Sequence, residues 1–234
     1  AAGEPGRFVR ALRAGDGVSG RRVRFALLID LDGTITEPAP GIIASIRHAL
    51  SALRIEPKSG DDLTWAIGPP LRGVFGRLGV QPADIERAIA LYRQKYAGGL
   101  MFDALIHDGM PEALAKLGAD GHRLFVCTSK PQIYAKEIVS HFGLAGAFEE
   151  IFGSELDGRR DNKGDLIAHI LAGRAIDPAR AIMIGDTEFD VGGARANGVE
   201  TIGVAWGHGG QKLAAARPAL ICAHPSELPD AARR

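Results

Sequence analysis

Phe25-Ala-Leu-Leu-Ile-Asp-Leu-Asp-Gly-Thr-Ile-Thr36 is the stretch that decides the fold, because a short apolar run ends there in two carboxylates. Residues 25–29 are typical of a short, fully buried strand. Such a strand can carry Asp30 and Asp32 only at an exposed end, where they share a face if the extended geometry persists. Gly33 then lets the chain turn away. Two carboxylates this close repel, which raises the pKa of one of them unless a cation intervenes. The pattern therefore predicts a metal-assisted catalytic site.

Composition limits the classes of function. The 28 Lys and Arg residues balance the 28 Asp and Glu residues, which argues against a nucleic-acid partner. No apolar run is long enough to cross a bilayer, and the N-terminal stretch lacks the apolar core of a signal peptide. Cys127 and Cys222 follow strand-like runs and resemble small core residues. We expect a reduced, cytoplasmic protein without a membrane partner, either monomer or dimer.

The order of elements predicts the architecture. Five further β-rich runs follow the first: Arg123–Thr128, Glu150–Gly153, Ala181–Gly185, Thr201–Ala205 and Ala219–Cys222. Helical patterns, such as Pro131–Phe142 and Gly164–Leu171, separate most of them. Strands that alternate with helices indicate an α/β protein with a doubly wound parallel sheet, covered on both faces.

The interval between the first two strands is too long for a single crossover. It holds two amphipathic helical patterns, one from Ile42 to Leu53 and one from Ile85 to Tyr96, with a rigid break at Ile67-Gly-Pro-Pro-Leu-Arg72 between them. We expect Tyr92 and Tyr96 to lie in the core of this insertion. The predicted division is an N-terminal extension of unknown role (1–24), an α/β core (25–39 and 102–234) and a small helical cap (40–101).

Polar residues gather where the predicted strands end. Thr128-Ser129-Lys130 closes the second strand before a helix, and hydroxyls with free N–H groups at a helix N-terminus form an anion site. Asp186 and Asp190 follow the fourth strand, and Lys163 precedes the helix at Gly164–Leu171. Ligands of parallel α/β sheets bind outside the carboxyl ends of the strands. All these side chains are therefore expected at one edge of the sheet.

This arrangement predicts phosphoryl transfer. Asp30, Asp32 and Asp186 form a site for a hard cation, for which Mg²⁺ is suited, beside an anion site of Thr128, Ser129 and Lys163. Asp30 is the expected nucleophile that forms an aspartyl-phosphate. Asp32 is expected to protonate the leaving alcohol and then to deprotonate the attacking water.

The order Asp-Leu-Asp-Gly-Thr, Thr-Ser-Lys-Pro, Lys and Gly-Asp-x-x-x-Asp resembles the four motifs of the haloacid dehalogenase-like hydrolase superfamily. The stretches at 67–72, 126–131, 153–158 and 162–163 are similar to its phosphoglycolate phosphatase-like branch, which carries a helical cap of the first type. This resemblance implies that Asp30 is the nucleophile and Asp32 the acid/base, with Asp32 binding the metal through its backbone carbonyl. It further implies that Asp186 is a Mg²⁺ ligand and that Asp190 orients the site.

Other reactions of the superfamily fit this chain less well. Dehalogenases generally lack an Asp at the position of Asp32, and related mutases tend to carry a His where this chain has Gly41-Ile42-Ile43. The expected function is hydrolysis of a small phosphorylated metabolite, with 2-phosphoglycolate as the leading substrate. Nucleoside monophosphates, pyrophosphate, sugar phosphates, a mutase and a non-catalytic binding module stay open. Arg72 is a weak candidate for substrate specificity, and His208 for the site opening.

Overall fold

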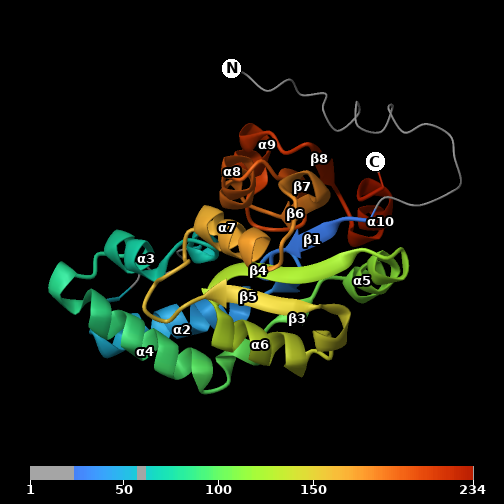
Figure 1. The fold of residues 1–234 in the computed structure, drawn as a ribbon. Helices are drawn as coiled ribbons and strands as arrows, with labels where there is room; N and C mark the ends of the chain where they lie inside the picture. Colours follow the sequence, from blue (N-terminus) through green and yellow to red (C-terminus); the bar gives the residue numbers. More distant parts are fainter. Residues whose placement is uncertain (1–23, 57–61, 234) are drawn as a thin grey trace, which may run out of the picture.

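A computed structural model describes residues 24–56 and 62–233, so the predicted extension lies, apart from Arg24, outside the described residues. A six-stranded sheet in the order β5-β4-β1-β6-β7-β8 forms its centre, and every neighbouring pair is parallel (Figure 1). Its strands are β1 (Ala26–Ile29), β4 (Arg123–Pro131), β5 (Glu150–Ser154), β6 (Ala181–Gly185), β7 (Glu200–Val204) and β8 (Leu220–Cys222). The predicted parallel sheet is confirmed.

Strand β1 lies in the middle of the sheet. Its last residue, Ile29, is in register with Val126 of β4 and Ile184 of β6. Both faces of β1 are covered: Leu27 and Ile29 belong to one apolar cluster, and Ala26 and Leu28 to the other. An uninterrupted apolar run is what a strand buried on both faces requires.

Helices cover each face of the sheet. One face packs against α7 (Lys163–Gly173) and α8 (Glu188–Ala196). The other packs against α5 (Met110–Ala119), α6 (Gln132–His141) and α10 (Leu228–Ala231), and α9 (Gly210–Ala216) packs beside α8. The sheet is therefore doubly wound, as predicted.

A helical segment, residues 38–104, is inserted in the sequence between β1 and the next strand of the sheet, β4. A small antiparallel pair, β2 (Thr36–Glu37) and β3 (Leu105–Ile106), brackets it. The segment contains α2 (Ala39–Ala52), η1 (Thr64–Ala66), α3 (Leu71–Arg77), η2 (Pro82–Asp84), α4 (Ile85–Ala97) and η3 (Leu100–Phe102). Helices α2, α3 and α4 lie on the side toward which the arrow of β5 points (Figure 1). The segment thus stands at the carboxyl edge of the sheet.

Two parts of the structure differ from what the sequence predicts. Helix α3 begins directly after Pro70, within the stretch expected as a break, because a proline is compatible with the residue before a helix but not with its interior. Strand β4 runs three residues beyond Thr128, with a register shift between Thr128 and Pro131, and α6 begins one residue later than expected. Both differences lie beside the predicted site.

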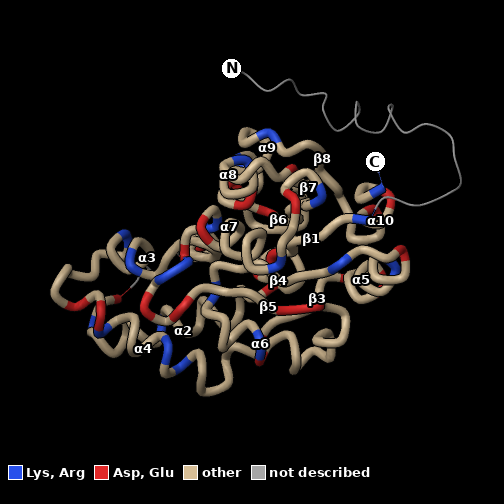
Figure 2. The backbone as a smooth tube through the Cα atoms, in the orientation of Figure 1, with Lys and Arg blue, Asp and Glu red and all other residues tan. Residues whose placement is uncertain are grey.

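Charges of both signs are interspersed along the chain. In Figure 2, Lys and Arg alternate with Asp and Glu over the described part of the tube without a long run of one sign. Among the helices of residues 24–56 and 62–233, none combines the length and apolar character that a bilayer crossing requires.

The central position of β1 is tested by Leu28→Ala. Leu28 is fully buried, so removing its side chain leaves a cavity, and we expect the free energy of unfolding to fall by about 2–5 kcal/mol. Leu105→Ala is the matched control, because Leu105 is 69% exposed and should cost less than about 0.5 kcal/mol. Urea denaturation measures both. Equal losses would contradict the assignment of β1 to the core.

Candidate active site

The predicted site residues meet at the carboxyl edge of three adjacent strands. Asp30 follows β1, Thr128 lies near the end of β4, and Asp186 follows β6. Because β1 pairs with both β4 and β6, the three positions are neighbours in space. All three line one cavity of about 720 Å³ between the sheet edge and the helical segment.

Asp30 is buried at the floor of this cavity. Its backbone N–H donates to the carbonyl of Ile184 at 2.9 Å, and its Oδ1 lies 2.9 Å from Nζ of Lys163. Burial raises the pKa of Asp30 to about 6, against the opposing charge of Lys163. The raised pKa was expected from repulsion by Asp32, but that charge is a smaller cause than burial.

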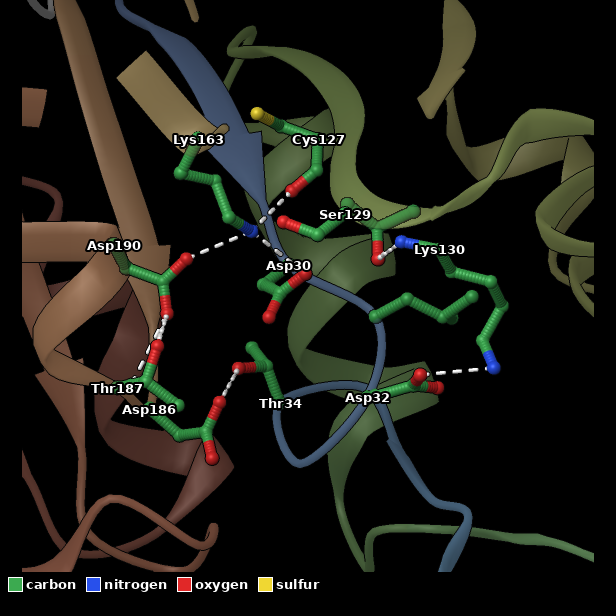
Figure 3. Close-up of polar contacts among 12 residues, drawn as sticks. Asp30, Asp32, Thr34, Cys127, Ser129, Lys130, Lys163, Asp186, Thr187 and Asp190 are labelled. Atoms are coloured by element: carbon green, nitrogen blue, oxygen red, sulfur yellow. Dashed lines mark hydrogen bonds and ion pairs between the residues drawn. The ribbon is translucent and has the colours of Figure 1, made fainter. Parts of the chain in front are cut away.

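Lys163 joins two strand ends through one ammonium group. It is the first residue of α7, whose N-cap Asn162 accepts a hydrogen bond from Gly164 N–H at 2.8 Å. Its Nζ donates to the Cys127 carbonyl at 3.0 Å and lies 2.9 Å from Asp30 and 2.8 Å from Asp190 (Figure 3). Burial alone lowers the pKa of Lys163, but the charges of Asp190 and Asp30 outweigh it and raise the pKa above its usual range. Lys163 is therefore a permanent cation at the site.

Asp186 presents a fully buried carboxylate with two donors. Thr34 Oγ1 donates to its Oδ1 at 3.3 Å, and the backbone N–H of His208 donates to its Oδ2 at 2.7 Å. Burial, with the charges of Asp30 and Asp190, raises the pKa of Asp186 to about 8. Such a carboxyl holds a proton at neutral pH until a cation replaces it.

Asp190 is fixed by the turn that starts α8. Its Oδ2 accepts hydrogen bonds from the backbone N–H and the hydroxyl of Thr187, at 3.1 and 2.8 Å. Its other oxygen faces Lys163. Asp190 thus holds Lys163 in place from the side opposite Asp30.

The acidic group fits a small hard cation. Asp30, Asp186 and Asp190 each bring one carboxylate oxygen within 4.8 Å of the others, and all three are buried. A Cβ at Gly33 would stand 2.4 Å from Oδ2 of Asp186, so only glycine allows this close approach, and its φ of +81° also favours glycine. Oxygen donors in a tight, charged pocket suit Mg²⁺.

The carboxylate of Asp32 points away from this acidic group. The strand geometry ends at Ile29, and the chain then closes a tight turn in which the Leu31 carbonyl accepts from Ile35 and Thr36. The Oδ2 atom of Asp32 lies 2.8 Å from Nζ of Lys130 (Figure 3). Because the alternation of side chains stops with the strand, Asp30 and Asp32 are each paired with a different lysine.

Thr128 and Ser129 lie in the bulged end of β4. The Thr128 hydroxyl accepts from Lys130 N–H at 3.2 Å, and the Ser129 carbonyl accepts from the Ser154 hydroxyl at 2.8 Å. Both residues line the cavity beside Asp30 and Lys163. The structure therefore places the residues of the predicted anion site together.

Arg72 and His208, the two weaker candidates, differ in where they lie relative to the cavity. Arg72, near the start of α3, lines the cavity, but its side chain is 69% exposed and forms an ion pair with Glu86 of α4. His208 is not a lining residue; its N–H binds Asp186 and its Nε2 lies 3.2 Å from Glu37.

The aromatic side chains that line the cavity and the buried Lys130 were not predicted as part of the site. Tyr92 and Tyr96 lie in the core, as expected, but they also line the cavity, as do Tyr134 and Phe189. Lys130 follows Thr128 and Ser129 in a polar strand end, so nothing in the sequence distinguished this buried lysine from an exposed one.

The chain thus combines a doubly wound parallel sheet with buried carboxylates, a shared lysine and hydroxyls at one edge of that sheet. The family model described as haloacid dehalogenase-like hydrolase matches residues 27–204. The chain belongs to this family, as the motifs indicated.

Curated relatives carry several names. A 5'-nucleotidase of Pseudomonas aeruginosa is 40% identical over 86% of this chain and 92% of that protein. The tyrosine-protein kinase PtkA of Mycobacterium tuberculosis is 41% identical over 78% of this chain and 62% of that protein. A phosphoglycolate phosphatase of Caulobacter vibrioides is 29% identical over 78% of this chain and 79% of that protein.

The fold has close structural neighbours. A predicted phosphatase from Clostridium acetobutylicum superposes with a TM-score of 0.84 at 36% identity, covering 89% of this chain and 98% of that one. With the family match and the curated phosphatases, this neighbour identifies the chain as a phosphoric monoester hydrolase.

The raised pKa of Asp186 predicts how the metal-free protein responds to pH. A carboxyl whose pKa is raised to about 8 on folding stabilises the folded state at low pH, and this contribution is lost as the pH rises from about 4 toward 8. In EDTA, we expect the melting temperature of Asp186→Asn to rise relative to that of the wild type between about pH 5 and about pH 8. Thermal unfolding by circular dichroism measures the difference.

Asp165→Asn is the control, because Asp165 is an exposed carboxylate of the same chemistry on α7. Its difference from the wild type should stay constant over this range. A constant difference for Asp186→Asn as well would contradict the raised pKa.

Proposed function

We propose that the protein is a Mg²⁺-dependent phosphatase that hydrolyses a small phosphomonoester through an aspartyl-phosphate on Asp30. The observation that carries this proposal is the position of Asp30 at the floor of the cavity, paired with Lys163 and beside Asp186. A nucleophilic carboxylate needs neighbouring positive charge to receive a phosphoryl group, and Lys163 supplies it.

In the first half-reaction, the Asp30 carboxylate attacks phosphorus and an Asp30 O–P bond forms. The bond between phosphorus and the ester oxygen breaks, and Asp32 gives its proton to the departing alcohol. The Thr128 and Ser129 side of the cavity receives the phosphoryl oxygens, with Lys163 balancing their charge.

In the second half-reaction, a water attacks the phosphorus of the aspartyl-phosphate. Asp32 takes the proton of that water, the Asp30 O–P bond breaks, and inorganic phosphate leaves with Asp30 restored. Asp30, Asp186 and the backbone carbonyl of Asp32 would hold Mg²⁺, and Asp190 would orient Lys163. When bound, the metal neutralises charge on the transferring group.

The cavity supports a nucleoside monophosphate over 2-phosphoglycolate. Its volume of about 720 Å³ lies within the usual range for sites that enclose larger ligands, and a two-carbon ester would leave most of it unfilled. Part of its wall is apolar and aromatic, and a nucleobase can stack there; the side chains that form this part are Tyr92, Tyr134, Leu156 and Phe189. The name of the Pseudomonas aeruginosa relative, 5'-nucleotidase, agrees with this class of substrate.

The name of PtkA raises transfer to a protein tyrosine as another possible activity. The chain matches only 62% of that protein, and in this chain the proposed role of Asp32 in activating water favours transfer to water. Phosphate release and peptide phosphorylation, measured on the same sample, distinguish the two activities.

Asp30→Asn tests the mechanism. The shape of the side chain is kept while the nucleophile is lost, so we expect turnover of phosphomonoesters to vanish with the fold intact. Asp32→Asn should lower kcat by about 10²–10⁴, because general acid/base catalysis is lost. Phosphate release with Mg²⁺ and with EDTA measures both variants, and EDTA should silence the wild type.

Asp165→Asn provides the matched control and should retain wild-type activity. Turnover that survives in Asp30→Asn would mean that Asp30 is not the nucleophile. Wild-type turnover that is unaffected by EDTA would contradict the metal requirement.

The substrate is tested with a panel of nucleoside monophosphates, 2-phosphoglycolate, sugar phosphates and pyrophosphate. We expect the highest kcat/KM for a nucleoside monophosphate, because among these compounds only it carries a nucleobase that can stack on the aromatic side chains of the cavity. Arg72→Ala should raise KM for this substrate more than for p-nitrophenyl phosphate, because Arg72 lines the cavity that the larger substrate would occupy. Arg87→Ala, which removes an exposed arginine of α4 outside the cavity, is the control. A best rate with 2-phosphoglycolate would overturn the size argument.

A further inference from the structure

One buried cation at the cavity has no part in the mechanism above. The Nζ atom of Lys130 lies 2.8 Å from Oδ2 of Asp32 and donates to the hydroxyl of Tyr96 at 2.6 Å. The side chain is only 5% exposed. A buried ammonium is costly unless it is paired and hydrogen-bonded, so these two partners define where it can lie.

Hydrogen bonds fix the backbone at Lys130 and at the residue before it. Its N–H donates to the Thr128 hydroxyl at 3.2 Å, within the register shift that precedes Pro131. The preceding carbonyl, of Ser129, accepts from the Ser154 hydroxyl at 2.8 Å. Because a bulge changes the direction of a side chain, this irregularity turns Lys130 out of the sheet and toward the helical segment.

The partner on the helical segment is equally fixed. Tyr96, on α4, is buried and stacks on Tyr92 with a centroid distance of 5.4 Å. The Tyr96 ring also makes a T-shaped contact with the ring of Tyr134, on α6, with a centroid distance of 5.8 Å. The Lys130 ammonium lies 4.7 Å from the centroid of the Tyr96 ring, within the range of a cation–π contact. Lys130 thus links an aspartate of the sheet edge to a tyrosine of α4.

We propose that Lys130 is a positioning residue that holds the carboxylate of Asp32, and that Tyr96 ties this pair to the helical segment. The orientation of the acid/base group and the seating of α4 over the site then depend on one another. This inference rests on the proposed function, because it concerns Asp32 as the group that gives a proton to the leaving alcohol. Misplacement of a catalytic group by a fraction of its contact distance is enough to slow an enzyme strongly.

The kinetic test uses two leaving groups. We expect Lys130→Met to lower kcat/KM for an alkyl phosphomonoester by about 10- to 100-fold, since kcat/KM covers the steps up to release of the alcohol. For p-nitrophenyl phosphate, whose leaving group departs without a proton, the loss should be several times smaller. Tyr96→Phe should also lower kcat/KM more for the alkyl ester than for p-nitrophenyl phosphate, but by a smaller factor than Lys130→Met. Lys136→Met, an exposed lysine of α6 outside the cavity, is the control.

Equal losses for both esters would overturn the inference, and so would a rise in KM with kcat unchanged, which would make Lys130 a substrate anchor. Wild type and Asp30→Asn, assayed beside these variants, decide the proposed function separately. Circular dichroism confirms that each variant is folded.

A second measurement does not depend on activity. Melting temperatures in EDTA of Lys130→Met, Tyr96→Phe and the double variant form a cycle, and we expect the double variant to lose less than the sum of the single losses. The same cycle with Tyr92→Phe, whose hydroxyl is not bonded to Lys130, should be closer to additive. Additive losses for Lys130 and Tyr96 would show that the two side chains are not linked.

Discussion

The site depends on one ammonium group that two buried carboxylates share. Lys163 Nζ lies within 3 Å of Asp30 and Asp190, and its charge offsets the repulsion between these buried acids. Lys163 opposes the burial and the charge of Asp190 that raise the pKa of Asp30, so without this lysine the pKa of Asp30 would lie higher still. In the proposed mechanism, the same cation also faces the incoming phosphoryl group.

The fold brings the residues around Lys163 together at one site. Parallel pairing brings the ends of β1, β4 and β6 to one edge, so residues distant in sequence meet without a long loop. The helical segment inserted between β2 and β3 then covers that edge, and its Tyr92 and Tyr96 line the cavity together with Tyr134 of α6 and Phe189 of α8. In the proposed mechanism the sheet edge holds the reacting groups, and side chains of α4, α6 and α8 surround the space for the ester. Lys130 joins these two parts through Asp32 and Tyr96.

Much of this arrangement could be read from the chain. The buried strands were predictable because β1 and β6 are apolar throughout, and the site followed because polar residues interrupt each strand at its end. The different orientations of Asp30 and Asp32 could not be predicted, because they follow from a tight turn that begins at Leu31, two residues after the end of β1. The partner of Lys130 was also out of reach, since Tyr96 lies 34 residues away and the contact requires the bulge in β4. The start of α3 was missed because a Pro-Pro pair signals a break as strongly as a helix start.

The most direct test of the mechanism is to trap the covalent intermediate. The protein is mixed with Mg²⁺ and a rapidly hydrolysed phosphomonoester, quenched in acid within the first turnovers, digested and analysed by mass spectrometry. If Asp30 is the nucleophile, the peptide that contains Asp30 gains the mass of one phosphoryl group, and hydroxylamine removes it. A phosphoryl group on another residue, or release of phosphate with no labelled peptide at any quench time, would contradict transfer through Asp30.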